Sequence, residues 1–223
     1  MAIQRLRVKY GRTGDLRFIA HLDVMRLWHR AMRRAGIAMA YSEGSTPRPR
    51  LSIAAALPVG VTSEGELLDV YLKRRISAFY FLTRIQGAIP ETLLVYEAVD
   101  VSMDAPSLQS QVRLAEYRVG VAPDGEAESV EDSVNGLLGK ETIPWEHRRD
   151  KEVRRYDLRA LVRDLWVEER SNGTVTLGML LRADPNASGR PEQIVAALGL
   201  PEPVWVHRTR LLLAPDLERG GIR

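Results

Sequence analysis

The chain has 223 residues, of which 45% are hydrophobic and 27% are charged. This composition excludes a disordered tail, and the length accommodates two cores of about 100 residues each. The sequence contains no cysteine, which excludes disulfides, thiolate nucleophiles, zinc sites built on sulfur and an iron–sulfur cluster held by this chain.

The net charge of +3 conceals an uneven distribution. Residues 1–50 hold eleven Arg or Lys against three Asp or Glu, a balance of +8, which leaves −5 for the remainder. We expect a polyanion to bind at the basic end. No apolar run approaches the roughly 18 residues of a membrane span, and the amino terminus shows no apolar signal segment. We therefore expect a cytoplasmic protein without a membrane partner.

The first hundred residues predict strands and helices in the order βαββαβ. Alternating apolar residues predict the strands, and apolar residues at every third or fourth position predict the helices. Gly36 is expected to end the first helix, and Ser77 to cap the second. The expected elements are a strand over 3–10, a turn over 11–15 with a short extension over 16–19, a helix over 21–35, strands over 51–57 and 67–72 joined through an acidic turn around Glu64 and Glu66, a helix over 77–87 and a strand over 93–101.

Residues 102–110 have the composition of a linker, after which a similar order begins again. We therefore expect two domains, 1–101 and 111–223. The expected fold class is α+β, with tandem ferredoxin-like βαββαβ halves and antiparallel sheets. The elements expected in the second half are strands over 112–121, 143–145, 175–182 and 204–213, and helices over 129–138, over 191–198 and after Asp157, where Leu158, Leu161, Val162 and Leu165 fall at helical spacing.

In each half, two helices should cover one face of the sheet and leave the other face open. RNA-recognition domains place exposed aromatic residues on that open face. This chain has only three Phe and no aromatic pair on a predicted central strand, so we expect no standard stacking platform. Basic loops and helices would then do any binding.

The predicted helix over 21–35 is amphipathic and carries a ridge of arginines opposite Val24, Trp28, Ala31 and Ala35. Guanidinium groups along such a ridge would track a phosphate backbone and make binding sensitive to salt. An ordinary solvated helix face is the alternative. The ridge consists of Arg26, Arg30, Arg33 and Arg34, beside Asp23.

Three residues of this helix, His21, Asp23 and His29, are candidates for catalysis. His21 lies on the apolar side, where a role at the helix start or in the core is the simpler interpretation. His29 borders the ridge and could donate to a phosphate. Because residues i and i+2 point to different faces of a helix, His21 and Asp23 predict no metal site.

The segment from Tyr41 to Ser52 holds two arginines beside prolines. Proline fixes its own φ and keeps the preceding residue out of the helical region, so Arg-Pro-Arg presents both guanidinium groups from a restrained backbone. Such groups suit phosphate or carboxylate, although a solvated hairpin turn would use the same residues. We expect Arg48 and Arg50 to bind the anion, on a scaffold of Tyr41, Ser42, Glu43, Gly44, Pro47 and Pro49.

Nearby acidic residues are expected to pair with arginines rather than act in acid–base chemistry. These are Glu43, Glu64, Glu66 and Asp69. The charged run over 147–155 either extends a basic groove or is an exposed loop. The sequence has no phosphate-binding glycine loop, no Gly-x-Ser-x-Gly elbow and no zinc spacing, so it gives no support for a nucleotide hydrolase or a serine hydrolase.

The first hundred residues resemble the radical-SAM-linked protein family. The resemblance rests on Phe18-Ile19-Ala20-His21-Leu22-Asp23, on the arginines of the ridge with Ala35-Gly36-Ile37, on Tyr41-Ser42-Glu43-Gly44, on Pro47-Arg48-Pro49-Arg50-Leu51-Ser52 and on Leu57-Pro58-Val59-Gly60-Val61. Ser45 stands where the family often has an aromatic residue. The resemblance implies a radical SAM protein as partner, which would carry the S-adenosylmethionine, the iron–sulfur cluster and the cobalamin, while this chain binds none of them.

We therefore favour a noncatalytic accessory protein that binds RNA, or a ribosome-related particle, through the basic helix and loop and docks onto a radical SAM enzyme. Two alternatives stay open. One is an RNA-processing or RNA-modifying enzyme similar to an endonuclease or a pseudouridine synthase, which would use His21, His29 and Asp23. The other is a module that binds only protein.

Overall fold

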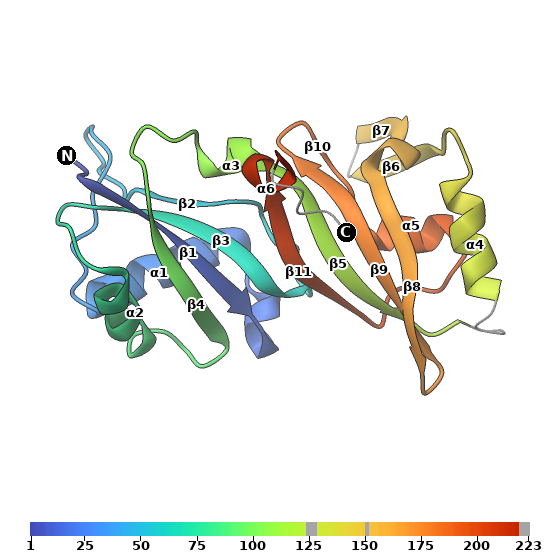
Figure 1. Ribbon diagram of the computed structural model, residues 1–223, viewed down its shortest axis with the longest axis horizontal. Helices are drawn as coiled ribbons and strands as arrows, with labels where there is room; N and C mark the ends of the chain where they lie inside the picture. The colour runs from blue at the N-terminus through green and yellow to red at the C-terminus, as the bar shows by residue number, and fades with distance from the viewer. Residues whose placement is uncertain (124–128, 150–151, 219–223) are drawn as a thin grey trace. The chain divides into compact units, whose positions relative to one another are not determined.

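The computed structural model describes residues 1–123, 129–149 and 152–218 (Figure 1). The chain divides into two compact units, Met1–Val112 and Arg113–Arg223. Both units combine helices with an antiparallel sheet, which confirms the predicted α+β class. Among the described residues, we find no helix with the length and apolar character that crossing a membrane requires.

The first unit has the βαββαβ order of a ferredoxin-like fold. Its sheet runs β4-β1-β3-β2, and each neighbouring pair is antiparallel. The strands are β1 (Gln4–Arg12), β2 (Leu51–Ile53), β3 (Thr62–Leu72) and β4 (Leu93–Val101), and the helices are α1 (His21–Arg34) and α2 (Ala78–Gln86).

The core of this unit lies between the helices and one face of the sheet. Leu6, Val8 and Tyr10 alternate along β1 and are fully buried. The ring of Tyr10 meets the indole of Trp28 edge-on, with centroids 5.2 Å apart. Helix α1 buries Val24, Trp28, Ala31 and Met32, which confirms the predicted amphipathic pattern.

Both helix boundaries follow the predicted signals. The hydroxyl of Ser77 accepts a hydrogen bond from the backbone N–H of Tyr80 at 3.1 Å and caps α2. Gly36 has φ of +69°, the left-handed conformation that ends a helix at low cost when the residue is glycine.

Two local predictions in the first unit are wrong. Residues Gly14–Phe18 form a 3-10 helix, η1, because Gly14 with φ of +52° turns the chain before an extension can form. Glu64 and Glu66 lie inside β3 rather than in a turn. Glu66 is buried opposite Tyr10 and accepts a hydrogen bond from the Ser63 hydroxyl at 2.7 Å, so a polar strand position was mistaken for a loop.

The second unit repeats the same topology. Its sheet runs β8-β9-β5-β11, again antiparallel where the register is defined. The strands are β5 (Val112–Val121), β8 (Val162–Ser171), β9 (Thr174–Asp184) and β11 (Trp205–Leu213), and the helices are α4 (Ser129–Leu138) and α5 (Pro191–Ala197). Short elements complete the chain: α3 (Leu108–Gln111), β10 (Ala187–Ser188) and α6 (Ala214–Glu218).

A two-stranded ribbon is inserted between α4 and β8. It consists of β6 (Pro144–Arg149) and β7 (Glu152–Asp157), paired antiparallel from Pro144 opposite Asp157. The charged run over 147–155 therefore belongs to a ribbon, although residues 150 and 151 lie outside the described part of the chain.

The helix expected after Asp157 does not form. One 3-10 turn, η2 (Arg159–Leu161), leads directly into β8. The register of β8 against β9 shifts between Val162 and Asp164, so an extra residue brings Val162 and Leu165 onto the same buried face. This bulge reproduces in a strand the three-residue apolar spacing of a helix.

Candidate nucleic-acid interface

Residues 40–50 form a short β-ribbon, here called the basic ribbon, between α1 and β2. The backbone N–H of Ser42 donates to the carbonyl oxygen of Arg48 at 2.8 Å, and that of Arg50 donates to the carbonyl oxygen of Ala40 at 2.8 Å. Tyr41 lies opposite Pro49 in an antiparallel bridge. These contacts hold Arg48 and Arg50 on one strand of the ribbon.

The tip of the basic ribbon is a polar turn. Gly44 has φ of +121°, which favours glycine at this position. The hydroxyl of Ser42 accepts a hydrogen bond from the backbone N–H of Arg48 at 3.0 Å and closes the turn. Glu43 and Pro47 are exposed at this tip, and Tyr41 and Pro49 pair across the ribbon farther from it.

A stack of aromatic and cationic groups fixes Arg50. The Cζ atom of Arg50 lies 4.4 Å from the centre of the Tyr71 ring, and that of Arg5 lies 5.6 Å from the same ring. Asp69 is fully buried and holds Arg5 through two hydrogen bonds of 2.8 and 2.6 Å. The Tyr71 ring thus contacts two guanidinium groups, one anchored in the interior and one exposed.

The segment after β4 covers the inner end of this stack. Arg5 donates from Nη1 to the carbonyl oxygen of Ala105 at 2.7 Å and from Nη2 to that of Pro106 at 2.8 Å. Arg7 also binds Asp69, with Nε 2.8 Å from Oδ1. Asp69 binds two arginines of β1, so the predicted pairing of this carboxylate with arginine holds, but its partners are not the arginines of the basic ribbon.

A third cation extends the positive surface. The Nζ atom of Lys73 lies 5.6 Å from the centre of the Tyr41 ring. Arg48, Arg50 and Lys73 are all exposed, and none of the three has an ion pair within the part of the chain that the structure describes. Unpaired guanidinium and ammonium groups in such proximity favour an anionic ligand.

The arginines of α1 lie in two different surroundings. Arg26 forms an exposed ion pair with Asp23 at 2.8 Å, one turn away. Arg30 and Arg34 line a depression of about 400 Å³ together with Leu27 and residues 87–90 after α2. Arg33 is exposed. The predicted ridge is therefore real as a helix face, but part of it faces α2 rather than the basic ribbon.

Helix α1 reaches the basic ribbon through His29. Its Nε2 atom lies 3.4 Å from the hydroxyl oxygen of Tyr41, and the two rings meet edge-on with centroids 6.3 Å apart. His21 is half-buried at the first residue of α1. In the described structure, neither histidine bonds to Asp23, whose partner is Arg26, so these three residues are not assembled into one group.

Metal coordination has no obvious basis in the described residues. They contain no cluster of three or more His, Asp or Glu side chains that could hold a metal ion. The chemistry that the basic ribbon offers is recognition of anions by fixed cations.

The charged run of the second unit is partly neutralised. Arg155 on β7 binds Glu146 on β6 with 3.0 Å between Nε and Oε2, and both side chains are exposed. His147 lies opposite Arg154 in the ribbon.

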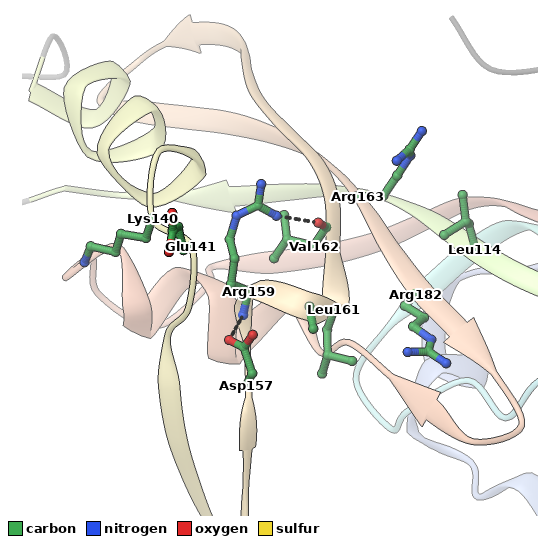
Figure 2. A pocket seen from close by; sticks show the side chains of 10 residues that line it. Leu114, Lys140, Glu141, Asp157, Arg159, Leu161, Val162, Arg163 and Arg182 are labelled. Carbon is green, nitrogen blue, oxygen red and sulfur yellow. Dashed lines mark hydrogen bonds between the residues drawn. The ribbon is translucent and has the colours of Figure 1, made fainter.

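A depression of about 500 Å³ lies where the β6–β7 ribbon joins the sheet (Figure 2). Figure 2 shows Arg159 above Asp157. The Oδ1 atom of Asp157 accepts hydrogen bonds from the backbone N–H groups of Arg159 at 3.0 Å and of Ile143 at 2.8 Å. The guanidinium of Arg159 donates to the carbonyl oxygens of Leu138 and Val162. The polar groups of Arg159 and Asp157 are thus bound to the backbone where the ribbon meets the sheet.

Four residues that support the interface were not predicted as a group. Sequence patterns gave no signal for Arg5, Tyr71 and Lys73, and they gave Asp69 only as an acidic neighbour. Arg5, Asp69 and Tyr71 meet because β1 pairs with β3, with Arg5 opposite Tyr71 and Arg7 opposite Asp69. Lys73 follows β3 directly and lies against the Tyr41 ring.

Comparison with known proteins places the chain in a family. Residues 5–191 match the model of a family described as an uncharacterized protein conserved in bacteria, DUF2344. No curated protein matches the chain.

Several solved structures resemble the fold. One is a Cbf5-Nop10-Gar1 complex, with a TM-score of 0.50 and 12% identity over 92% of this chain and 48% of the other. An archaeal box H/ACA sRNP Nop10-Cbf5 complex has a TM-score of 0.47 and 13% identity, and covers 93% of this chain and 48% of the other. An H/ACA RNP bound to a substrate RNA has a TM-score of 0.47 and 13% identity, and covers 98% of this chain and 56% of the other. The chain spans about half the length of these chains, and at such identities the likeness concerns the fold alone.

Proposed function

We propose that this chain, which belongs to the DUF2344 family of uncharacterized proteins conserved in bacteria, is an accessory protein that binds RNA through the basic ribbon and α1 and docks onto a radical SAM enzyme. The observation that carries the RNA part is the position of Arg50. Its guanidinium lies 4.4 Å from the centre of the Tyr71 ring, which contacts the buried Arg5 on β1. An exposed cation held in place before the ligand arrives loses less entropy on binding.

The choice of a polyanion follows from the surrounding charges. Arg48, Arg50 and Lys73 have no carboxylate partner in the described structure, and Arg30, Arg33 and Arg34 on α1 likewise lack one. The contact between His29 and Tyr41 joins the helix to the basic ribbon. A phosphate backbone supplies negative charge at repeated intervals, as an extended set of cations requires.

RNA rather than double-stranded DNA is the favoured polyanion because of the shape of the interface. The basic ribbon is short and lies in the connection between α1 and β2. Among the described helices, only α1 presents a row of arginines that could enter a major groove. Guanidinium planes and tyrosine rings at its base suit single-stranded segments, whose bases are available for stacking.

The docking part of the proposal rests on the resemblance of the first hundred residues to the radical-SAM-linked family. The sequence has no cysteine, so the partner would supply the iron–sulfur cluster, together with the S-adenosylmethionine and cobalamin. In this arrangement the chain presents the RNA and the partner performs the chemistry.

Measuring RNA affinity at several salt concentrations tests the RNA part. We expect the Arg48→Ala, Arg50→Ala pair to weaken binding at least about tenfold and to reduce the salt slope by about 1.4, since each lost phosphate contact on a single strand contributes about 0.7. The matched control is Arg17→Ala with Arg163→Ala, which removes two exposed arginines elsewhere and should change affinity less than about threefold. Wild-type protein that fails to bind RNA at low salt, or equal losses in both pairs, would overturn the proposal.

Copurification tests the docking part independently. Tagged protein should retain the radical SAM protein of the same organism after nuclease treatment, because the contact is between proteins. Loss of the partner on nuclease treatment would mean that RNA bridges the two proteins. Failure of the partner to copurify even without nuclease would overturn the docking proposal.

A further inference from the structure

We infer that the second unit carries a stacking site for two unpaired RNA bases, formed by Trp166 and Trp205 on the face of its sheet that the helices leave uncovered. The inference rests on the proposed function for the class of ligand. It concerns another part of the chain from the basic ribbon and depends on different chemistry.

Trp166 lies against a glycine of the neighbouring strand. It is directly opposite Gly178, and a Cβ atom added to that glycine would lie 2.0 Å from Cε2 and 2.3 Å from Cζ2 of the indole. Glycine is therefore the residue that lets this ring occupy the surface of β9. The ring is held over the sheet instead of projecting from it.

Trp205 repeats the arrangement on the other side of β5. A Cβ atom at Gly120 would lie 2.2 Å from Nε1 and 2.4 Å from Cε2 of Trp205. The backbone N–H of Val204 donates to the carbonyl oxygen of Gly120 at 2.8 Å, which fixes the start of β11 beside this glycine. Two strand-interior glycines thus each receive an indole from the adjacent strand.

The register places both rings on one face. Gly178 is opposite Arg118, and Gly120 follows Arg118 by two residues, so the side-chain directions of positions 118, 120 and 178 agree. The intervening residues Tyr117 and Val119 are buried and point to the other face. From strand spacing and rise, Gly120 and Gly178 are about 8 Å apart, which is close enough for two neighbouring nucleotides of one strand.

This face is accessible at Trp205 and Arg118, and buried at Thr176 and Leu180, which share it with Gly178. Trp205 is 39% exposed and the Arg118 side chain is 43% exposed, while Trp166 is half-buried. Arg118 binds Glu168 at 2.8 Å. A second ion pair joins Arg210 to Glu116 at 2.7 Å. With its arginines paired, this face offers π surfaces and a guanidinium plane rather than net positive charge.

Aromatic faces with paired charges around them indicate the kind of ligand that suits this site. Stacking on indole tolerates any base and contributes without phosphate neutralisation, so the site suits unpaired bases of an RNA that the basic ribbon holds by its phosphates. Bases within a duplex are already stacked and are not available to it. The two surfaces would therefore divide recognition between charge and stacking.

Affinity of the full chain for an oligouridine of roughly ten nucleotides, and for a duplex of the same length, tests the inference. The Trp166→Leu, Trp205→Leu pair keeps an apolar cover on both glycines but removes the aromatic faces, and we expect at least about a tenfold loss for oligouridine with an unchanged salt slope and unchanged duplex binding. The Trp166→Tyr, Trp205→Tyr pair should stay within about threefold of wild type. Oligouridine binding by the leucine pair equal to wild type would overturn the inference.

A measurement on the wild-type chain guards against failure of the variants to fold. In NMR spectra, saturating oligouridine should shift the indole N–H signals of Trp166 and Trp205. The indole N–H signal of Trp28, which is fully buried in the first unit, should stay unchanged. Unshifted signals of Trp166 and Trp205 in the complex would overturn the inference. If wild-type protein binds no RNA, the proposed function fails; if it binds and only the Arg48→Ala, Arg50→Ala pair weakens binding, the stacking site alone fails.

Discussion

Arg5 and Asp69 form an ion pair in the interior of the first unit, with 2.6 Å between Nη2 and Oδ2 and side chains that are 1% and 0% exposed. The Nε of Arg5 also donates to Asp69 Oδ2 at 2.8 Å, and Nη1 and Nη2 donate to the backbone carbonyl oxygens of Ala105 and Pro106. The pair joins the middle of the sheet to the segment that follows β4, and it positions the guanidinium on which the Tyr71 ring lies.

Replacing Asp69 by Asn should destabilise the protein by about 3–5 kcal/mol, because Arg5 would remain buried without its counter-charge. Urea unfolding measures the loss. Asp23→Asn is the matched control, since its pair with Arg26 is exposed and should contribute less than about 1 kcal/mol. Similar losses for the two variants would contradict this account of the buried pair.

Replacing Tyr71 by Leu should weaken RNA binding about two- to fivefold, because an exposed cation–π contact contributes about 0.5–1 kcal/mol. Both arginines of the basic ribbon remain, so the dependence of affinity on salt should not change. Tyr71→Phe keeps the ring beneath Arg50 and should bind like wild type. A changed salt slope in the leucine variant would show that Tyr71 does more than hold Arg50.

Replacing Gly178 by Ala should displace the indole of Trp166, since the added Cβ would lie 2.0 Å from Cε2. We expect a destabilisation of about 1–3 kcal/mol and a loss of oligouridine affinity similar in direction to that of the leucine pair. Gly136→Ala in α4 is the control, because no atom lies within 4 Å of its Cβ position and alanine favours the helix. Thermal unfolding and oligouridine affinity are measured for both variants. Losses in Gly178→Ala alone indicate displacement of the ring, and equal losses in both variants indicate a general effect of adding a methyl group.

Alkaline pH should reveal a contribution from Tyr96. Burial raises the pKa of this tyrosine above its usual value of 10.0, and the negative charge of Glu64 raises it further. Above pH 10 the folded protein therefore retains the proton more tightly than the unfolded chain, so stability falls as pH rises. The stability of Tyr96→Phe should fall less steeply than that of wild type over the same range in urea unfolding, and parallel curves would contradict the assignment.

Much of the fold follows from patterns that are local in the sequence. The strand over 112–121 and the helix over 129–138 were predicted to the residue, because their apolar periods are regular. The segment after Asp157 was not, because a bulge between Val162 and Asp164 changes the period within a strand. Local spacing cannot distinguish that case from a helix.

The candidate sites divide in the same way. The sequence predicted which arginines lie on α1 and on the basic ribbon, since neighbours along the chain define both. It did not predict the support of Arg50 by Tyr71, which depends on strand pairing. The tryptophans were not predicted because each reaches its glycine from a neighbouring strand, Trp166 from β8 and Trp205 from β11. Glycines at 120 and 178, in the middle of apolar strands, were the available signal.

Both units place their added ribbon at the same point of the βαββαβ order, between the first helix and the second strand: residues 40–50 in one and β6–β7 in the other. In each unit that second strand pairs with only one strand of its own unit, so the connection can lengthen or change without altering the register of the inner strands. Each unit is thus a βαββαβ module with one replaceable appendage. Grafting either appendage from a homologue should transfer its binding preference while the two sheets that carry it remain as they are.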